Sequence, residues 1–287
     1  MHWRISIISL VAVVGMGLAS VQALTQQPRG ELTIDKVKDN LYNIVGNGGN
    51  VGVLVTNEGV ILVDDKFEED YDAIMAHVRS VTSQPVKYVI NTHYHADHSG
   101  GNTRFLPVAE VISTRNARTN ILEGKQSNAP PGVRPANTVF TEEMSVFLGG
   151  QEVRARHFGR GHTNSDAIVY FPALRTIHTG DMMAGATPLI DYNGGGSIVE
   201  WTRTWDAAVA EFDFDTVIPG HGAVTDPTGL QTYRDNVVKL RERVRGLISD
   251  GRTEAEIGAI LAQDYPAYAE GSLYRQWSLP GFMTELR

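Results

Sequence analysis

Residues 91–101 read Asn-Thr-His-Tyr-His-Ala-Asp-His-Ser-Gly-Gly, so three histidines and one aspartate fall within six positions. The apolar run 86–90, which ends just before them, predicts a buried strand. His93 and His95 would point the same way if the extended backbone continues for one more step, whereas Asp97 and His98 would turn away toward a second metal. Histidines also occur as ordinary surface residues of loops. Such crowding of imidazole and carboxylate groups favours a metal site, and zinc is the usual metal for these ligands.

Three further segments place a histidine or an aspartate beside glycines, at a strand end or in a loop between strands. They are Gly161-His162-Thr163, Gly180-Asp181 and Pro219-Gly220-His221-Gly222. Glycine lets the backbone approach a metal without steric conflict. Each segment alone is explained equally well by a histidine at a turn or by a capping aspartate. Like residues 91–101, these segments lie where predicted strands end, at the edge of a sheet. Their common position favours one shared site.

The rest of the sequence predicts strands and helices in two similar halves. The expected strands are 32–46 and 51–64, the latter folded at Asn57-Glu58-Gly59, then 86–90, a hairpin over 138–158, 167–171, 175–178 and 216–218. The expected helices are 68–81, 200–212 and 228–248, and residues 124–137 are expected to form a surface loop. This order predicts an α/β fold, an αββα four-layer sandwich of two mixed β-sheets with outer helices.

The N-terminus has the layout of a secretory signal peptide. Arg4 precedes an uncharged apolar run over 5–19, and Val21-Gln22-Ala23 fits a cleavage site. We therefore predict a signal peptide over 1–23, a single domain over 24–287, and a periplasmic or secreted protein without a stable membrane anchor after cleavage. An uncleaved N-terminal anchor is the alternative, although the run is short for a membrane span.

Composition excludes several kinds of site and partner. The chain of 287 residues has no cysteine, which excludes disulfides, thiolate zinc sites, iron–sulfur clusters and cysteine nucleophiles. Any metal must be held by His, Asp or Glu. The net charge of −8 argues against nucleic acid as the partner, because that partner needs a basic surface. A small-molecule substrate is expected instead.

The ordered motifs resemble those of the metallo-β-lactamase superfamily over nearly all of residues 32–230. The resemblance implies the αββα sandwich and two Zn²⁺ ions per chain along one edge of it. It assigns three ligands to the first zinc, three to the second and one bridging ligand to both: His93, His95 and His162; Asp97, His98 and His221; and Asp181.

The chemistry implied is hydrolysis by a metal-bound hydroxide. Zinc lowers the pKa of bound water toward roughly 7, so a nucleophile would exist at neutral pH to attack a carbonyl or phosphorus centre. Asp97 is the predicted catalytic residue, because it would both bind metal and orient the hydroxide. Tyr192 or Asn193 would bind substrate by donating a hydrogen bond to a developing oxyanion, unless their glycine-rich segment is simply a flexible loop. Ser99, Thr163 and Asp64 are candidate partners of the ligands, with turn and strand-end hydrogen bonding as the alternative.

The substrate is not fixed by this resemblance. Authentic β-lactamases of the superfamily lack a metal-binding aspartate at the position of Asp181, and one subclass uses cysteine. Thioesterases of the glyoxalase II type, lactonases and phosphodiesterases carry that aspartate. Export favours a β-lactam hydrolase, so we predict a zinc hydrolase that opens a cyclic amide or ester, with β-lactams first and lactonase, esterase or thioesterase activity as the alternative. A phosphodiesterase, which the acidic charge disfavours, an iron-dependent persulfide dioxygenase and a non-catalytic binding module are the remaining readings.

Overall fold

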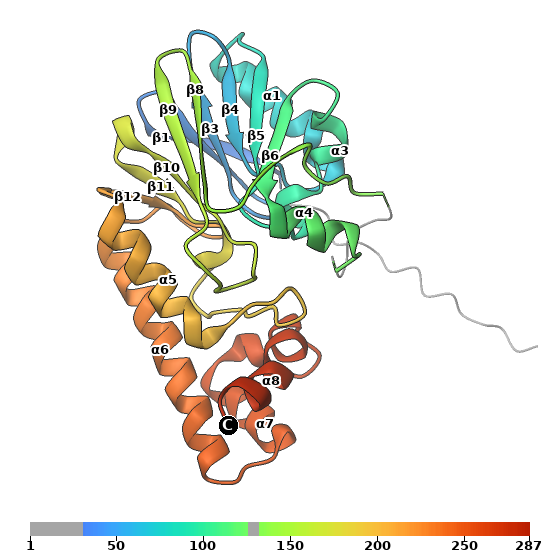
Figure 1. Ribbon diagram of the computed structural model, residues 1–287, viewed down its shortest axis with the longest axis vertical. Coiled ribbons are helices and arrows are strands. Elements are labelled where there is room, and N and C mark those ends of the chain that lie inside the picture. The colour runs from blue at the N-terminus through green and yellow to red at the C-terminus, as the bar shows by residue number, and fades with distance from the viewer. Residues whose placement is uncertain (1–30, 126–131) are drawn as a thin grey trace, which may run out of the picture.

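The computed structural model describes residues 31–125 and 132–287 (Figure 1). The predicted signal peptide over 1–23 lies outside the described residues, and so does part of the predicted loop over 124–137. Among the described residues, no helix has both the length and the apolar character needed to cross a membrane.

The first sheet has seven strands in the order of the chain. They are β1 (Thr33–Lys38), β2 (Leu41–Val45), β3 (Val51–Val55), β4 (Val60–Val63), β5 (Val86–Ile90), β6 (Glu110–Thr114) and β7 (Thr138–Phe140). β1 to β4 form an antiparallel meander, and β4 to β7 run parallel. The predicted strand 32–46 is therefore two strands, which turn at Asn40 with a φ of 62°.

The second sheet has five strands in the order β12-β11-β10-β9-β8. They are β8 (Glu143–Leu148), β9 (Gln151–Arg156), β10 (Ile168–Phe171), β11 (Thr176–His178) and β12 (Thr216–Ile218). All neighbours are antiparallel except β11 and β12, which are parallel. The hairpin predicted over 138–158 is shorter than expected, because its first residues, 138–140, pair with β6 in the other sheet.

Helices complete the two outer layers. The α-helices are α1 (Tyr71–Val81), α2 (Ala96–Ser99), α3 (Asn102–Phe105), α4 (Arg115–Leu122), α5 (Ile198–Glu211), α6 (Pro227–Ser249), α7 (Glu254–Asp264) and α8 (Leu273–Glu285). Four single 3₁₀ turns are described as well: η1 (Glu68–Asp70), η2 (Pro172–Leu174), η3 (Gly180–Met182) and η4 (Pro266–Tyr268).

Three apolar clusters confirm the four-layer αββα sandwich. One lies between the sheets and joins Leu54 and Ile61 of the first to Val153 and Val169 of the second. A second packs α1 on the outer face of the first sheet. The third packs α5 to α8 on the outer face of the second sheet, and it includes Trp201 as a buried core residue. Burial of such apolar surface is the main force that holds the layers together.

The two C-terminal helices, α7 and α8, extend beyond the elements that the sequence analysis predicts. A capping box starts α7, because Thr253 Oγ1 accepts from the Glu256 backbone N–H and Glu256 accepts from the Thr253 N–H. Ser272 caps α8 in the same way with its side chain. Figure 1 shows both helices gathered against the far half of α6.

The parallel pairs of strands decide where the polar segments lie. β4 and β5 run parallel, and Asp64 N–H donates to the Ile90 carbonyl at 2.9 Å just beyond them. β11 and β12 are also parallel, and Thr179 N–H donates to the Ile218 carbonyl at 2.9 Å. Because parallel strands end at the same edge of a sheet, residues 91–98 gather beside Asp64, and residues 179–181 lie beside 219–221.

Candidate metal centre

A first group of buried side chains converges where β5 ends. His93, His95, His162 and Asp181 each offer one ligand atom, and these atoms lie within 4.8 Å of one another. His95 Nδ1 is 3.1 Å from His93 Nε2 and 2.9 Å from His162 Nε2. His162 Nε2 is in turn 3.7 Å from Asp181 Oδ2. Three imidazoles and one carboxylate therefore face a common point.

A second group forms beside it from Asp97, His98 and His221. The short helix α2 carries Asp97 and His98, and His221 follows β12. His221 Nε2 lies 3.1 Å from Asp97 Oδ2 and 3.3 Å from His98 Nε2. Asp97 and His221 keep 26% and 36% of their side chains exposed, so this group lies on the solvent side of the centre.

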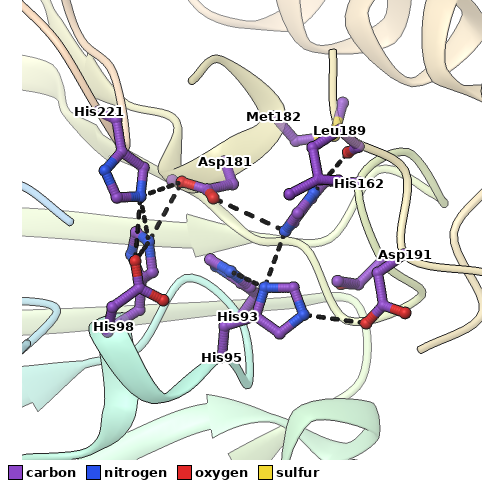
Figure 2. Close-up of polar contacts among 12 residues, drawn as sticks. His93, His95, His98, His162, Asp181, Met182, Leu189, Asp191 and His221 are labelled. Carbon is purple, nitrogen blue, oxygen red and sulfur yellow. Dashed lines mark hydrogen bonds and ion pairs between the residues drawn. The ribbon is translucent and has the colours of Figure 1, made fainter. Parts of the chain in front are cut away.

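Asp181 lies between the two groups (Figure 2). Its Oδ1 is 3.1 Å from His98 Nε2 and 3.5 Å from His221 Nε2, while Oδ2 faces His162. Its neighbours must be glycines: a Cβ on Gly220 would lie 2.1 Å from Asp181 Oδ1, and Gly180 has a φ of 49°. The structure thus brings together all seven predicted ligands, with one carboxylate oxygen turned to each group.

The outward-facing ring nitrogens fix the tautomers of three histidines. His98 Nδ1 lies 2.7 Å from Asp64 Oδ2, and His95 Nε2 lies 2.9 Å from Asp191 Oδ2. His162 Nδ1 lies 2.7 Å from the Leu189 carbonyl. Carboxylates and carbonyls only accept hydrogen bonds, so these nitrogens carry the protons. The inward nitrogens of the neutral rings are therefore lone pairs, as metal ligation requires.

His93 is held in the same sense through a threonine. Thr92 donates its hydroxyl to Asp64 Oδ2 at 2.8 Å, so its Oγ1 accepts from His93 Nδ1 at 3.1 Å. Asp64, a predicted partner of the ligands, therefore supports His98 directly and His93 through Thr92. It is fixed in turn by the Thr92 backbone N–H at 2.7 Å.

These tautomers fit a bound cation. Lone pairs of neighbouring imidazoles face one another at 2.9 and 3.1 Å, which is repulsive until a positive charge lies between them. Burial lowers the pKa of His162 to about 4 and that of His93 well below its usual range, so both rings are neutral ligands. Burial also lowers the pKa of His98, but the nearby carboxylates, chiefly Asp181 and Asp97, raise it well above its usual range. A metal cation would replace that proton.

Comparison with known proteins gives the family. A family model described as the metallo-beta-lactamase superfamily matches residues 44–221. The chain belongs to this superfamily. It is 25% identical over 242 residues to a type 2 metallo-beta-lactamase of Elizabethkingia meningoseptica, covering 80% of this chain and 94% of that relative. It is also 25% identical over 199 residues to the 2,4-dinitroanisole O-demethylase subunit alpha of Nocardioides sp. (strain JS1661), covering 66% of this chain and 57% of that protein.

Solved structures agree on the fold. A metallo-beta-lactamase from Pontibacter korlensis has a TM-score of 0.63 at 19% identity and covers 72% of this chain and 98% of its own. The DIM-1 metallo-beta-lactamase has a TM-score of 0.62 at 22% identity and covers 74% of this chain and 99% of its own. Family membership and the two His/Asp groups together make this metallo-β-lactamase superfamily member a metallohydrolase.

Other predicted residues lie less close to the ligands of this metallohydrolase. Tyr192 donates its hydroxyl to Glu285 Oε2 at 2.6 Å and packs edge-on against Phe282, so its polar end is engaged with α8. Asn193 lies exposed on the following turn. Ser99 donates to backbone carbonyls of its own loop, and Thr163 bonds Asp166 at its backbone and hydroxyl. The substrate-binding roles of Tyr192 and Asn193 stay predictions.

Two contacts of His95 were not predicted from the sequence. Asp191 accepts from His95 Nε2 and from the Tyr94 hydroxyl, and its other oxygen accepts from the Gly194 N–H at 2.9 Å. The indole of Trp277, on α8, lies 5.0 Å from the His95 ring centre to centre. Asp191 precedes Tyr192 and Asn193, the candidate substrate contacts of a glycine-rich segment, so a search for acidic residues there would have found it. No motif marks Trp277.

A buried lysine supports the second group. Lys66 is fully buried and adopts a φ of 54°, a conformation that is costly for lysine. Its Nζ donates to the carbonyls of Asn47, at 2.9 Å, and Gly49. A Cβ on Gly49 would lie 2.2 Å from His98 Cε1, so this loop lies directly against the metal-binding imidazole. Burial lowers the pKa of Lys66 to about 8.

Proposed function

We propose that the protein is an exported dinuclear zinc hydrolase that opens a cyclic amide or ester, with β-lactams as the first substrates to test. The observation that carries the proposal is Asp181, whose two carboxylate oxygens face two separate groups of ligands. The donor set supports zinc, because it consists of neutral imidazoles and carboxylates without sulfur. The names of the metallo-beta-lactamase relatives support β-lactams.

The residues divide the work between holding and orienting. Two bound zinc ions would supply a nucleophilic hydroxide at neutral pH and polarise the carbonyl oxygen of the substrate. The three histidines of the first group are buried and fixed by outward hydrogen bonds, so they hold their positions without reorganisation. Asp97 has a partly exposed carboxylate beside His221, where it can accept a hydrogen bond from an attacking water and orient it.

Lactones and other esters are the second candidate class. An aspartate at the position of Asp181, whose oxygens face both ligand groups, is what the resemblance associates with lactonases, thioesterases and phosphodiesterases. Lys66 supplies no clamp for the carboxylate of a β-lactam, because its ammonium is buried and donates to two backbone carbonyls. The relative named as an O-demethylase subunit also shows that the similarity extends beyond lactamases.

Metal analysis and a substrate panel test the proposal. The purified protein is expected to contain about two zinc ions per chain and to hydrolyse at least one of nitrocefin, an acyl-homoserine lactone and a thioester, but no phosphodiester. Intact nitrocefin with an opened lactone would remove the β-lactam part and leave the hydrolase. Iron in place of zinc would point to the oxygenase instead. Zinc-loaded protein that opens none of the substrates would contradict the proposal.

The proposed export has a separate test. N-terminal sequencing of protein from the periplasmic fraction of an expressing bacterium is expected to begin just after Ala23. Protein that retains Met1 and stays with the membrane fraction would instead indicate an uncleaved anchor.

A further inference from the structure

The feature that carries a further inference is the inner face of α8, a helix beyond the segment that the family model matches. Ser278, Leu279 and Phe282 of α8 are buried in the core shared with α5 and α6. Trp277 is only half-buried, and its indole lies against His95 of the first ligand group. The two ring centroids are 5.0 Å apart, and the ring planes make an angle of 46°. The largest side chain of this helix is therefore at the metal centre and not in the apolar core.

The contacts of His95 leave no structural need for that indole. Its imidazole is already fixed by Asp191 at Nε2, while Nδ1 faces His93 and His162. Tyr94 already packs beside the ring, with centroids 4.6 Å apart. Among the hydrogen bonds of residues 31–125 and 132–287, none uses the Trp277 indole N–H. A half-exposed indole beside a reactive centre offers a flat apolar surface to a bound molecule.

Tyr274 extends this surface by one turn of α8. It precedes Trp277 by three residues, so both side chains share one face of the helix. Its ring packs against Tyr268, with centroids 5.7 Å apart. Burial, and to a lesser extent the charge of Asp181, raises the pKa of Tyr274. The two aromatic side chains therefore lie next to each other on α8, with Trp277 against the ligand His95.

We propose that Trp277 and Tyr274 form the wall against which an uncharged, flat apolar group of the substrate packs while its scissile bond lies at the metal-binding residues. The inference rests on the proposed function and adds the substrate class, an ester or amide with an aryl or extended acyl substituent next to the ring. An aromatic wall selects such a group because ring contacts add affinity beyond the area that they bury. A carboxylate packed on that apolar ring would instead lose hydration, which is costly for a charged group.

The test uses matched ligands that differ only in this group. Two substrate pairs serve: N-phenylacetyl- and N-acetyl-homoserine lactone, and benzylpenicillin and 6-acetamidopenicillanic acid. The wild type is expected to have the lower KM for the aryl member of the pair that it hydrolyses. Trp277→Ala should reduce that preference about tenfold, by raising KM for the aryl member more than for the smaller member. Trp277→Phe should restore most of the preference.

A binding measurement keeps the test independent of turnover. Calorimetry with the non-hydrolysed γ-lactam analogues of the two homoserine lactones should show the same aryl preference in zinc-loaded protein. Zinc content should be equal in wild type, Trp277→Ala and the control Trp205→Phe, whose indole is buried in α5 away from the ligands. If Trp277→Ala unfolds, Trp277→Leu and Trp277→Phe supply the comparison, and the leucine variant should lose the preference.

The outcomes separate this inference from the proposed function. An aryl preference that is equal in wild type and in the folded alanine or leucine variant overturns the wall, even if hydrolysis is confirmed. Loss of zinc together with an unchanged preference also overturns it, since Trp277 would then only support His95. A Trp277-dependent preference in the lactam titration upholds the wall even if no substrate on the panel is hydrolysed.

Discussion

Asp191→Asn should weaken metal binding at the first group while it preserves the shape of the side chain. In the wild type, Asp191 Oδ2 accepts from His95 Nε2 at 2.9 Å and from the Tyr94 hydroxyl, and Oδ1 accepts from the Gly194 N–H at 2.9 Å. Burial alone would raise the pKa of Asp191, but the hydrogen bond and charge of His95 and the bond from Tyr94 lower it to about 2. The carboxylate is therefore ionised at neutral pH and accepts at both oxygens.

An asparagine cannot satisfy all of these donors. If its amide oxygen stays with Gly194, its NH₂ group faces His95 Nε2 and favours the tautomer protonated at Nδ1. That is the atom 2.9 Å from His162 Nε2 and 3.1 Å from His93 Nε2, and a protonated Nδ1 cannot bind metal. If the amide is flipped, NH₂ opposes the Gly194 N–H. Loss of such a partner typically costs 10- to 100-fold in metal affinity, which is about 1.4–2.8 kcal/mol.

Competition with a chromophoric zinc chelator at pH 7 measures the two binding steps. One step should weaken by roughly 10- to 100-fold in Asp191→Asn, and the other should stay near the wild-type value. Asp166→Asn is the matched control, because Asp166 is also buried but accepts from Thr163 and from no metal ligand. Wild-type affinity in Asp191→Asn, or an equal loss in the control, would refute the proposed support of His95.

Three further predictions concern the bridging ligand and the loop beside it. Asp181→Ala should lower activity and zinc content together, because its oxygens face both groups; full activity with two metals would disprove the bridging role. Gly220→Ala should displace Asp181, since the new Cβ would lie 2.1 Å from its Oδ1, and metal analysis should show a loss that Gly246→Ala, in open space on α6, does not. Lys66→Met tests the buried ammonium through stability. The folded-state pKa of Lys66, about 8, lies below the unfolded value near 10.4, so the folded state binds fewer protons between these two pH values. In urea titrations, the free energy of unfolding of the wild type should therefore rise relative to that of the variant as the pH rises from about 8 to about 10.4. A difference that does not change with pH would contradict this.

The ligand set was predictable because it depends on local sequence and on strand order. His93, His95, Asp97 and His98 are close in the chain, and the other ligands follow strands or glycine-rich turns. Once 86–90 and 216–218 are predicted as strands, their ends are natural places for a site. The hairpin over 138–158 was mispredicted at its start because residues 138–140 complete the parallel part of the first sheet, and pairing with a distant strand leaves no local signal.

The partners of the ligands were mostly not predictable, because they come from residues far along the chain. Asp64 was named from the sequence, yet its bond to His98 spans 34 positions. Asp191 reaches His95 across 96 positions, and Trp277 has no motif around it. Tyr192 shows a contact that was missed, while its substrate-binding role stays a prediction. It stands in a promising segment, but its hydroxyl bonds Glu285, which the sequence gives no reason to expect.

These partners tie the supports of His95 and His162 to the C-terminal helices. The segment that supports His95 and His162, through Asp191 and the Leu189 carbonyl, is fastened to the C-terminal helices. Ser278 Oγ accepts from the Ile190 N–H and donates to the Ile190 carbonyl, both at 3.0 Å. The Glu285 carboxylate, also on α8, accepts from two hydroxyl groups and one backbone N–H within residues 192–198.

The second group draws on both sheets, because His221 follows β12 of the second sheet while His98 is supported from the first. His98 rests on Asp64 at the end of β4 and on the loop that Lys66 secures. The family model ends at residue 221, so the supports of the first group come partly from outside the segment shared with the superfamily. A change in α8 would thus reach the first group through residues 189–198, which hold His95 and His162. Divergence of the C-terminal helices could in this way alter substrate choice without changing any metal ligand.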